Sequence, residues 1–180
     1  GEGPKYINSP ETPLFHKQEN LFALNKAIDA IRKAGFVVIC EGYMDAISFH
    51  VAGLRMAVAP LGTAFTLKQA YLLKRWTDQI YFAFDADPAG QKAAEKAIVS
   101  ATSLGFDSRV ILFPNGKDAS EILEKEGAES LQKLPNLAIT GSDFLLQRAC
   151  SLFDCDSVEG KSRAIRYLYP YIDALDEEIR

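Results

Sequence analysis

The chain has few residues of the kinds that build disulfide frameworks or zinc sites. Its 180 residues include three cysteines and two histidines, and Cys150 and Cys155 are not spaced as a CxxC pair. These counts argue against a disulfide-rich secreted domain and against a zinc site on this chain. The chain also lacks a run of the roughly 20 apolar residues that a membrane span needs, and it shows no signal-peptide pattern. We therefore expect a cytoplasmic protein.

An excess of positive charge is also missing. The formal net charge is −4 at pH 7, so the chain as a whole lacks the basic footprint of many nucleic-acid-binding proteins. A nucleic-acid site would have to depend on local basic groups or on bound metal ions. Hydrophobic residues make up 48% of the chain, which is ordinary for a folded protein with a core.

Short apolar runs alternate with helical patterns through the middle of the chain. Buried strands are predicted at 36–40, 56–59, 79–84 and 109–113, and helices at 20–34, 45–51, 66–76, 88–99 and 119–126. Strands that are apolar throughout are typical of a parallel sheet covered on both faces. The pattern therefore predicts an α/β fold, with a parallel four-stranded sheet and helices on both faces.

The two ends of the chain differ from this alternating region. Residues 1–34 begin with an irregular, proline-containing stretch and finish with a helix, and residues 35–134 form the α/β domain. Beyond residue 134 the strand signal stops, so residues 135–180 are expected to be a small helical subdomain. Its helices are predicted at 142–153 and 157–179, with a kink or break at Pro170.

Carboxylates follow three of the predicted strands. Glu41 follows the first, Asp85 and Asp87 follow the third, and Asp118 lies in the loop after the fourth, with Asp45 one turn beyond Glu41. The carboxyl ends of parallel strands share one edge of a sheet, which is where ligands bind in open α/β folds. Several carboxylates cannot all stay ionised there without cations, and Mg²⁺ prefers oxygen ligands of this kind. The sequence therefore predicts a divalent-metal site.

Each acid also has a structural interpretation. Asp87 or Asp45 could cap the helix that follows it, and Asp85 or Glu41 could be a solvated acid at a strand end. Asp118 with Glu121 fits a capping box. The residues alone leave these alternatives open.

Several motifs together resemble those of one family. Segments 41–45 (EGYMD) and 84–90 (FDADPAG) resemble the signature of a Toprim domain, which primases, topoisomerases and some nucleases share. Segments 4–12 (PKYINSPET), 15–17 (FHK), 61–63 (LGT) and 115–118 (NGKD) are similar to stretches of bacterial DnaG-type DNA primases. The resemblance covers nearly the whole chain and implies part of the RNA polymerase core of such a primase.

The resemblance also implies roles for individual residues. Glu41, Asp85 and Asp87 would be catalytic and would hold Mg²⁺ or Mn²⁺ together with Asp118. Asp45 and Glu121 would lie behind these ligands. The family has an acid at the position of Ser120, so the number of bound ions stays open. The residues expected to line the nucleotide or template path are Lys5, Asn8 and Lys17.

A DnaG-type primase makes short RNA primers on a DNA template at the bacterial replication fork. The expected partners are single-stranded DNA, nucleoside triphosphates, the replicative helicase through a domain absent from this chain, and a single-stranded DNA-binding protein. We expect the chain to prime weakly or not at all alone. The alternatives are another Toprim enzyme, such as a topoisomerase or nuclease, a metal-binding interaction module, and a receiver-like domain.

Overall fold

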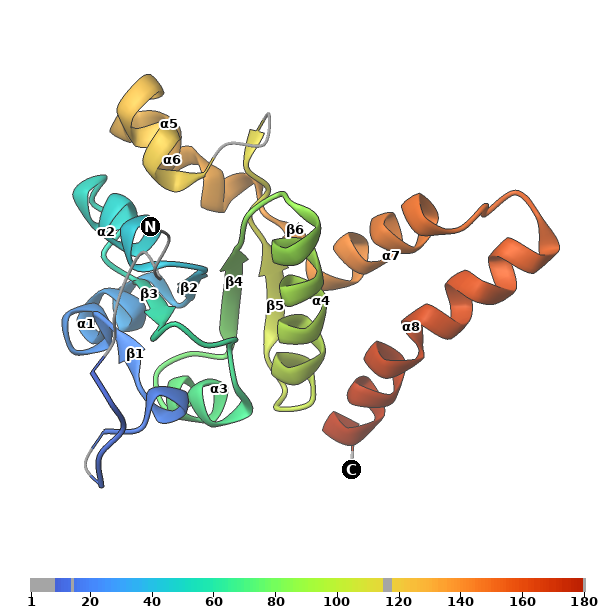
Figure 1. Ribbon diagram of the computed structural model, residues 1–180, viewed down its shortest axis with the longest axis horizontal. Coiled ribbons are helices and arrows are strands. Elements are labelled where there is room, and N and C mark those ends of the chain that lie inside the picture. Colours follow the sequence, from blue (N-terminus) through green and yellow to red (C-terminus); the bar gives the residue numbers. More distant parts are fainter. Residues whose placement is uncertain (1–8, 14, 115–117, 180) are drawn as a thin grey trace.

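The computed structural model describes residues 9–13, 15–114 and 118–179. Within these ranges the chain forms a six-stranded sheet with the strand order β1-β3-β2-β4-β5-β6 (Figure 1). The strands are β1 (Leu21–Phe22), β2 (Val37–Cys40), β3 (Ala57–Pro60), β4 (Gln79–Ala83), β5 (Asp107–Val110) and β6 (Ile139–Thr140).

The sheet is mixed, which corrects the prediction of a four-stranded parallel sheet. Its centre, β3-β2-β4-β5, is parallel as expected. An antiparallel strand is added at each edge, because β1 pairs with β3 and β6 pairs with β5. Both edge strands have two residues. A segment this short shows no alternation that could reveal it in the sequence.

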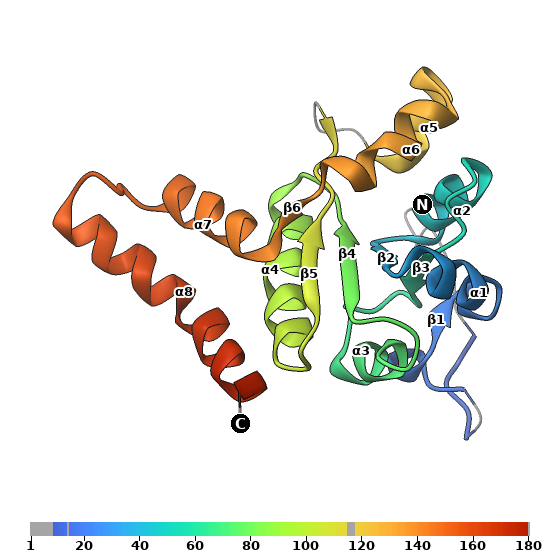
Figure 2. The same cartoon turned by 180° about the vertical axis from the view of Figure 1, so that it is seen from behind.

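Helices cover both faces of the sheet, as predicted. They are α1 (Leu24–Ala34), α2 (Tyr43–Val51), α3 (Leu67–Leu73), α4 (Pro88–Thr102), α5 (Ala119–Glu126), α6 (Ala128–Lys133), α7 (Gly141–Leu152) and α8 (Val158–Ile179). Short 3₁₀ turns add η1 (Lys17–Glu19) and η3 (Leu134–Leu137). Figure 2 shows the same arrangement from behind.

Successive residues of β2 supply the two halves of the core. Val37 and Ile39 face the layer that contains α1, α3, α4 and α7, whereas Val38 and Cys40 face the layer of α2, α5 and α6. All four side chains are fully buried. Side chains of a strand alternate between faces, so a strand covered on both sides must be apolar at every position. This is why the sequence pattern that predicted the strand was a continuous apolar run.

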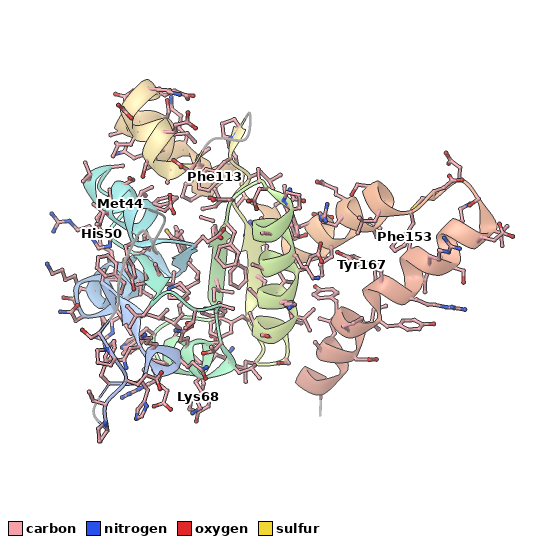
Figure 3. All side chains as sticks on the ribbon, in the orientation of Figure 1. Met44, His50, Lys68, Phe113, Phe153 and Tyr167 are labelled. Atoms are coloured by element: carbon pink, nitrogen blue, oxygen red, sulfur yellow. The ribbon has the colours of Figure 1, made fainter. Side chains whose placement is uncertain are left out.

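The last two helices extend from the sheet beyond α4 (Figure 1). Phe144 of α7 is buried in the main core, and α8 contacts both α4 and α7. Phe153 and Tyr167 join α7 to α8 through an edge-to-face ring contact with centroids 6.0 Å apart (Figure 3). No described helix is long and apolar enough to cross a membrane.

Helix α8 continues through Pro170, so the prediction of a break there is wrong, and the alternative of a kink stays a prediction. Proline removes one backbone hydrogen bond from a helix interior. Leu168 and Tyr171, on either side of Pro170, both pack against the main core. This tertiary packing compensates for the missing bond and keeps the two halves in one element.

Candidate functional site

The predicted acids meet at the carboxyl end of the parallel strands. Glu41 directly follows β2, and Asp85 lies two residues beyond β4. A cleft of about 540 Å³ opens at this edge. Its lining residues are Glu41, Gly42, Tyr43, Met44, Asp45, Pro60, Gly62, Asp85, Asp118 and Ser120. Four of the five candidate acids therefore face one cleft, and Asp87 is not among the lining residues.

Glu41 links the ends of two neighbouring strands. Its Oε2 accepts a hydrogen bond from the backbone N–H of Asp85 at 3.2 Å. Glu41 is exposed and Asp85 is half-buried. Strand β2 is paired with β4 along its whole length, from Val37 opposite Ile80 to Cys40 opposite Ala83. The register of this pair brings together two acids that are 44 residues apart in the chain.

Asp87 begins α4 as its N-cap. Its Oδ1 accepts a hydrogen bond from the N–H of Gly90 at 2.7 Å, and Pro88 occupies the first helical position. Both choices are typical of a helix start. Gly90 is required by close packing, because a Cβ there would lie 2.4 Å from the carbonyl oxygen of Asp85. The capping interpretation of Asp87 is therefore observed, and this side chain is exposed.

The other two acids also hold helix starts. Asp118 caps α5 by accepting from the N–H of Glu121 at 2.7 Å. Asp45, at the third position of α2, accepts from the N–H of Gly42 at 3.3 Å. The side chain of Glu121 forms an ion pair with Lys125 on the outer surface of α5. Helix α5 therefore directs Asp118 into the cleft and engages Glu121 with a cation of its own helix.

Burial and the neighbouring carboxylates of the cleft raise the pKa values of Asp45 and Asp85. Burial, and to a lesser extent the charges of Asp85, Asp118 and Glu41, together raise the pKa of Asp45 to about 6, and the hydrogen bond from the Gly42 N–H opposes this increase. Burial also raises the pKa of Asp85, as do Glu41, Asp118 and Asp87. None of the described residues that line the cleft is basic. Crowded carboxylates of this kind gain stability from a bound cation.

The chemistry of these donors fits a divalent cation. Carboxylate oxygens are the ligands that Mg²⁺ and Mn²⁺ prefer. No three Asp, Glu, His or Cys residues of the described chain lie close enough to form a ligand group. The acids thus share a cleft and an electrostatic field, and a cation bound by more than two of them would require the side chains to move together.

Of the three predicted nucleotide-binding residues, Lys17 is described. Lys17 lies in η1, where its backbone N–H donates to Glu11 Oε1 at 3.3 Å and its carbonyl accepts from Gln69 Nε2 at 3.1 Å. The bond from Gln69 attaches η1 to α3, and Lys17 does not line the acidic cleft. Lys5 and Asn8 lie outside the described residues.

Several residues of the cleft wall were not predicted from the sequence. Tyr43 and Met44 lie between Glu41 and Asp45 and bring apolar surface into the cleft, and Figure 3 shows Met44 on α2. Ser120 lines it from α5, and its hydroxyl contacts that of Ser48 at 3.1 Å. The contact joins α2 to α5. The position of Tyr43 and Met44 inside the EGYMD segment was the available signal.

Comparison with known proteins identifies this architecture. A Toprim-like family model matches residues 38–123, and a model of the N-terminal domain of the DNA primase catalytic core matches residues 1–28. The DNA primase of Treponema pallidum is 40% identical over 176 residues, which cover 98% of this chain and 29% of the relative. The chain belongs to the DnaG-type primase family. It spans about 30% of the length of the curated relatives that it matches first.

Solved primase structures share the fold. A DNA primase domain from Pseudomonas aeruginosa matches with a TM-score of 0.85 and 33% identity, over 98% of this chain and 55% of that one. A DnaG primase catalytic domain bound to single-stranded DNA matches with a TM-score of 0.84 and 32% identity, over 96% of this chain and 55% of that one. The resemblance inferred from the motifs is confirmed. This primase segment therefore corresponds to part of a DnaG catalytic core.

A third family model adds a feature that the motifs did not indicate. Residues 142–180 of this primase segment match a DnaB-helicase binding domain of primase. This range contains most of α7 and all of α8. We expected the helicase-binding part of the family to be absent from the chain, and this match corrects that expectation. The two helices combine a buried face against α4 with exposed apolar residues such as Ile165 and Tyr169.

Proposed function

We propose that this chain supplies the metal-binding part of a DNA primase, which makes short RNA primers on single-stranded DNA by nucleotidyl transfer. The observation that carries the proposal is the cleft in which Glu41, Asp45, Asp85 and Asp118 gather, with no basic side chain among its described lining residues. Membership of the primase family supports the same activity. Because the chain spans about 30% of its curated relatives, full activity would need residues beyond it.

Glu41, Asp85, Asp87 and Asp118 would hold divalent cations, either Mg²⁺ or Mn²⁺. A bound divalent cation would neutralise phosphate charge and favour attack of a 3′-hydroxyl oxygen on a nucleoside triphosphate, with release of pyrophosphate. Asp87 and Asp118 are each oriented by the helix that they cap, and their side chains would have to move for one cation to be bound by more than two of the carboxylates. Glu41 is fixed to the backbone of Asp85.

Asp45 and Glu121 would act behind these ligands. Asp45 accepts a hydrogen bond from Gly42 and so holds the start of α2, and its pKa of about 6 means that it limits the negative charge of the cleft only below about that pH. Glu121 orients Asp118 through its backbone N–H. Lys17, with Lys5 and Asn8, would contact nucleotide or template from the N-terminal segment.

The partners that we propose follow from the comparisons. One similar primase structure holds single-stranded DNA, which supports a DNA template here. The match of residues 142–180 to a helicase-binding domain supports contact with the replicative helicase. Nucleoside triphosphates would be the substrates, and a single-stranded DNA-binding protein would be a further partner. The place of action would be the bacterial replication fork in the cytoplasm.

Metal and nucleotide binding test the proposal directly. Titration calorimetry of the chain with ATP should show binding only when Mg²⁺ or Mn²⁺ is present. Asp85→Asn should abolish it, whereas Asp107→Asn should leave it unchanged, because Asp107 lies at the opposite end of β5. Binding of ATP without a cation would instead favour an interaction module.

Activity assays separate the proposal from other Toprim chemistry. In the full-length protein, Asp85→Asn or Asp87→Asn should lower primer synthesis by at least about 100-fold, the scale expected for loss of a charge-stabilising group. Cleavage of DNA by the wild-type protein, without primer synthesis, would point to a topoisomerase or nuclease. Unchanged priming by both variants would remove the two residues from the catalytic role.

A further inference from the structure

A second, smaller cavity lies beside the acidic cleft. Its volume is about 220 Å³, and it opens between the ends of β4 and β5, the first turns of α4, and α7. Phe84, Phe113 and Phe144 supply aromatic surface from these separate elements, and Ile111 adds an aliphatic wall. Figure 3 shows Phe113 beyond the end of β5, at the same edge of the sheet as the cleft. The proposed function gives this cavity no role.

Asp85 belongs to the walls of both cavities. The backbone of Asp85 packs closely against Gly90, because a Cβ at position 90 would lie 2.4 Å from the Asp85 carbonyl oxygen. Gly90 also lines the small cavity. One residue therefore separates the carboxylate cleft from an apolar cavity, and a single ligand can reach both if it carries a charged group at one end and an apolar ring at the other.

The cavity has the lining that suits a flat, neutral ring. Small-molecule sites usually measure about 300–1,000 Å³, so this one is too small for a whole nucleotide. No basic side chain of the described residues lines it, and Asp85 would repel a phosphate there. Leu112 stands at the wall with 45% of its surface exposed, so apolar surface is available to a ligand without rearrangement of the core.

Gln91 gives the cavity a polar contact. It lies one turn inside α4, is half-buried, and lines the wall. Its side-chain amide makes no hydrogen bond to any part of the chain that the structure describes. A glutamine amide offers both donors and acceptors, and this combination matches the edge of a nucleobase. Stacking on aromatic surface accepts any base, while the amide adds preference among them.

We propose that this cavity is a nucleobase subsite, lined by Phe84, Phe113, Phe144 and Leu112, with Gln91 as its hydrogen-bonding residue. The proposal deepens the proposed function and rests on it, because the phosphates of the same nucleotide would lie in the acidic cleft, where the divalent cation of the proposed function would offset their repulsion by the carboxylates. The base comes either from a free nucleotide or from a single-stranded template, and both present the same chemistry.

The test uses a ligand that has a base and no phosphate. Adenosine is titrated into the chain in EDTA, and NMR follows the side-chain amide of Gln91 and the methyl groups of Leu112 and Ile111. These signals should shift saturably at millimolar adenosine. Gln91→Leu should weaken binding about five-fold, the effect of one hydrogen bond. Lys92→Leu, at the next position of the same helix, should leave the affinity unchanged.

Titrations with two further ligands identify whether the base comes from a free nucleotide or from a single-stranded template. Adenosine monophosphate and a short oligothymidylate are compared at the same signals, and the tighter of the two is the physiological type of ligand. Absence of saturable shifts with all three ligands overturns the proposal. Equal affinity in wild type and Gln91→Leu overturns it as well, because the amide would then play no part. A Leu112→Ala variant provides a second check, since an exposed side chain can be shortened without unfolding the core.

Failure of the subsite is distinguishable from failure of the proposed function. Cation-dependent ATP binding that is lost in Asp85→Asn but insensitive to Gln91→Leu would keep the metal site and remove the subsite. If adenosine shifts the Gln91 signals but ATP shows no cation-dependent binding, the subsite would be kept and the metal site would be removed.

Discussion

Asp45 provides a prediction whose size can be worked out from the structure. Burial and the charges of Asp85, Asp118 and Glu41 raise its pKa from 3.8 to about 6. The folded state therefore binds this proton more tightly than the unfolded state does. Stability is then lost as the pH rises between these two values, and the full loss is reached above about pH 6. Replacing Asp45 with Asn removes the charge and keeps an acceptor for the Gly42 N–H.

The expected gain follows from the shift. A change of about two pKa units corresponds to about 3 kcal/mol, and solvent screening across the open cleft reduces it to about 1–3 kcal/mol. Asp45→Asn should therefore be more stable than wild type by this amount at about pH 7.5, and the difference should vanish near pH 4. Urea unfolding in EDTA, followed by circular dichroism at a series of pH values, measures it.

Asp143 offers a matched control for this experiment. It occupies the same third position in α7 that Asp45 occupies in α2, and its carboxylate accepts from Thr140 Oγ1 at 2.7 Å. Asp143→Asn should give no gain at neutral pH, since Asp143 does not line the acidic cleft. Added Mg²⁺ should shrink the advantage of Asp45→Asn, because a cation favours the charged form of Asp45. A stability difference that does not change with pH would refute the reasoning.

Three further predictions concern packing and helix starts. Gly90→Ala should destabilise the fold by about 1–3 kcal/mol, as overpacking does, because the new Cβ would lie 2.4 Å from the Asp85 carbonyl oxygen; an unchanged melting temperature would contradict this contact. Arg148→Met should lower the free energy of unfolding by about 2 kcal/mol, because Arg148 forms an ion pair with Glu95 at 2.9 Å and only 22% and 17% of the two side chains are exposed. A double-mutant cycle with Glu95→Gln should show coupling between the two residues, and additive effects would count against the pair. Thr140→Ala should cost about 1 kcal/mol through loss of the α7 cap, with Thr140→Ser as the control that keeps it in urea unfolding.

The central strands could be predicted because their signal is local. Residues 37–40 and 79–83 are apolar at almost every position, as a strand buried on both faces must be. The last strand shows where this reasoning stops. Residues 109–113 were expected from their apolar run, yet β5 spans Asp107–Val110, because it pairs with Gln79–Phe82 of β4. Ile111 and Phe113 are buried although they lie beyond the end of β5. The apolar run 109–113 therefore indicated buried residues and did not show which residues pair with β4.

The site could be predicted only as a set of acids on one edge. Parallel strands deliver their carboxyl ends together, so the convergence of Glu41, Asp85 and Asp118 followed from the strand assignment. The double role of Asp118 as a helix cap and a cleft residue was left open by the sequence, because both roles use the same residue type. The raised pKa of Asp45 depends on burial and on three other carboxylates, and no local pattern contains that information.

The sequence by itself determined the positions of the central strands β2, β3 and β4, the helices that follow them, and which edge of the sheet is acidic. Each of these depends on the order and type of neighbouring residues. Tertiary structure alone decided that the edge strands β1 and β6 join the sheet, that α8 runs unbroken through Pro170, and that a cavity lined by Phe84, Phe113 and Phe144 lies behind Asp85. These features arise from contacts between segments far apart in the chain, and the energy of such contacts is fixed only when the whole core has packed.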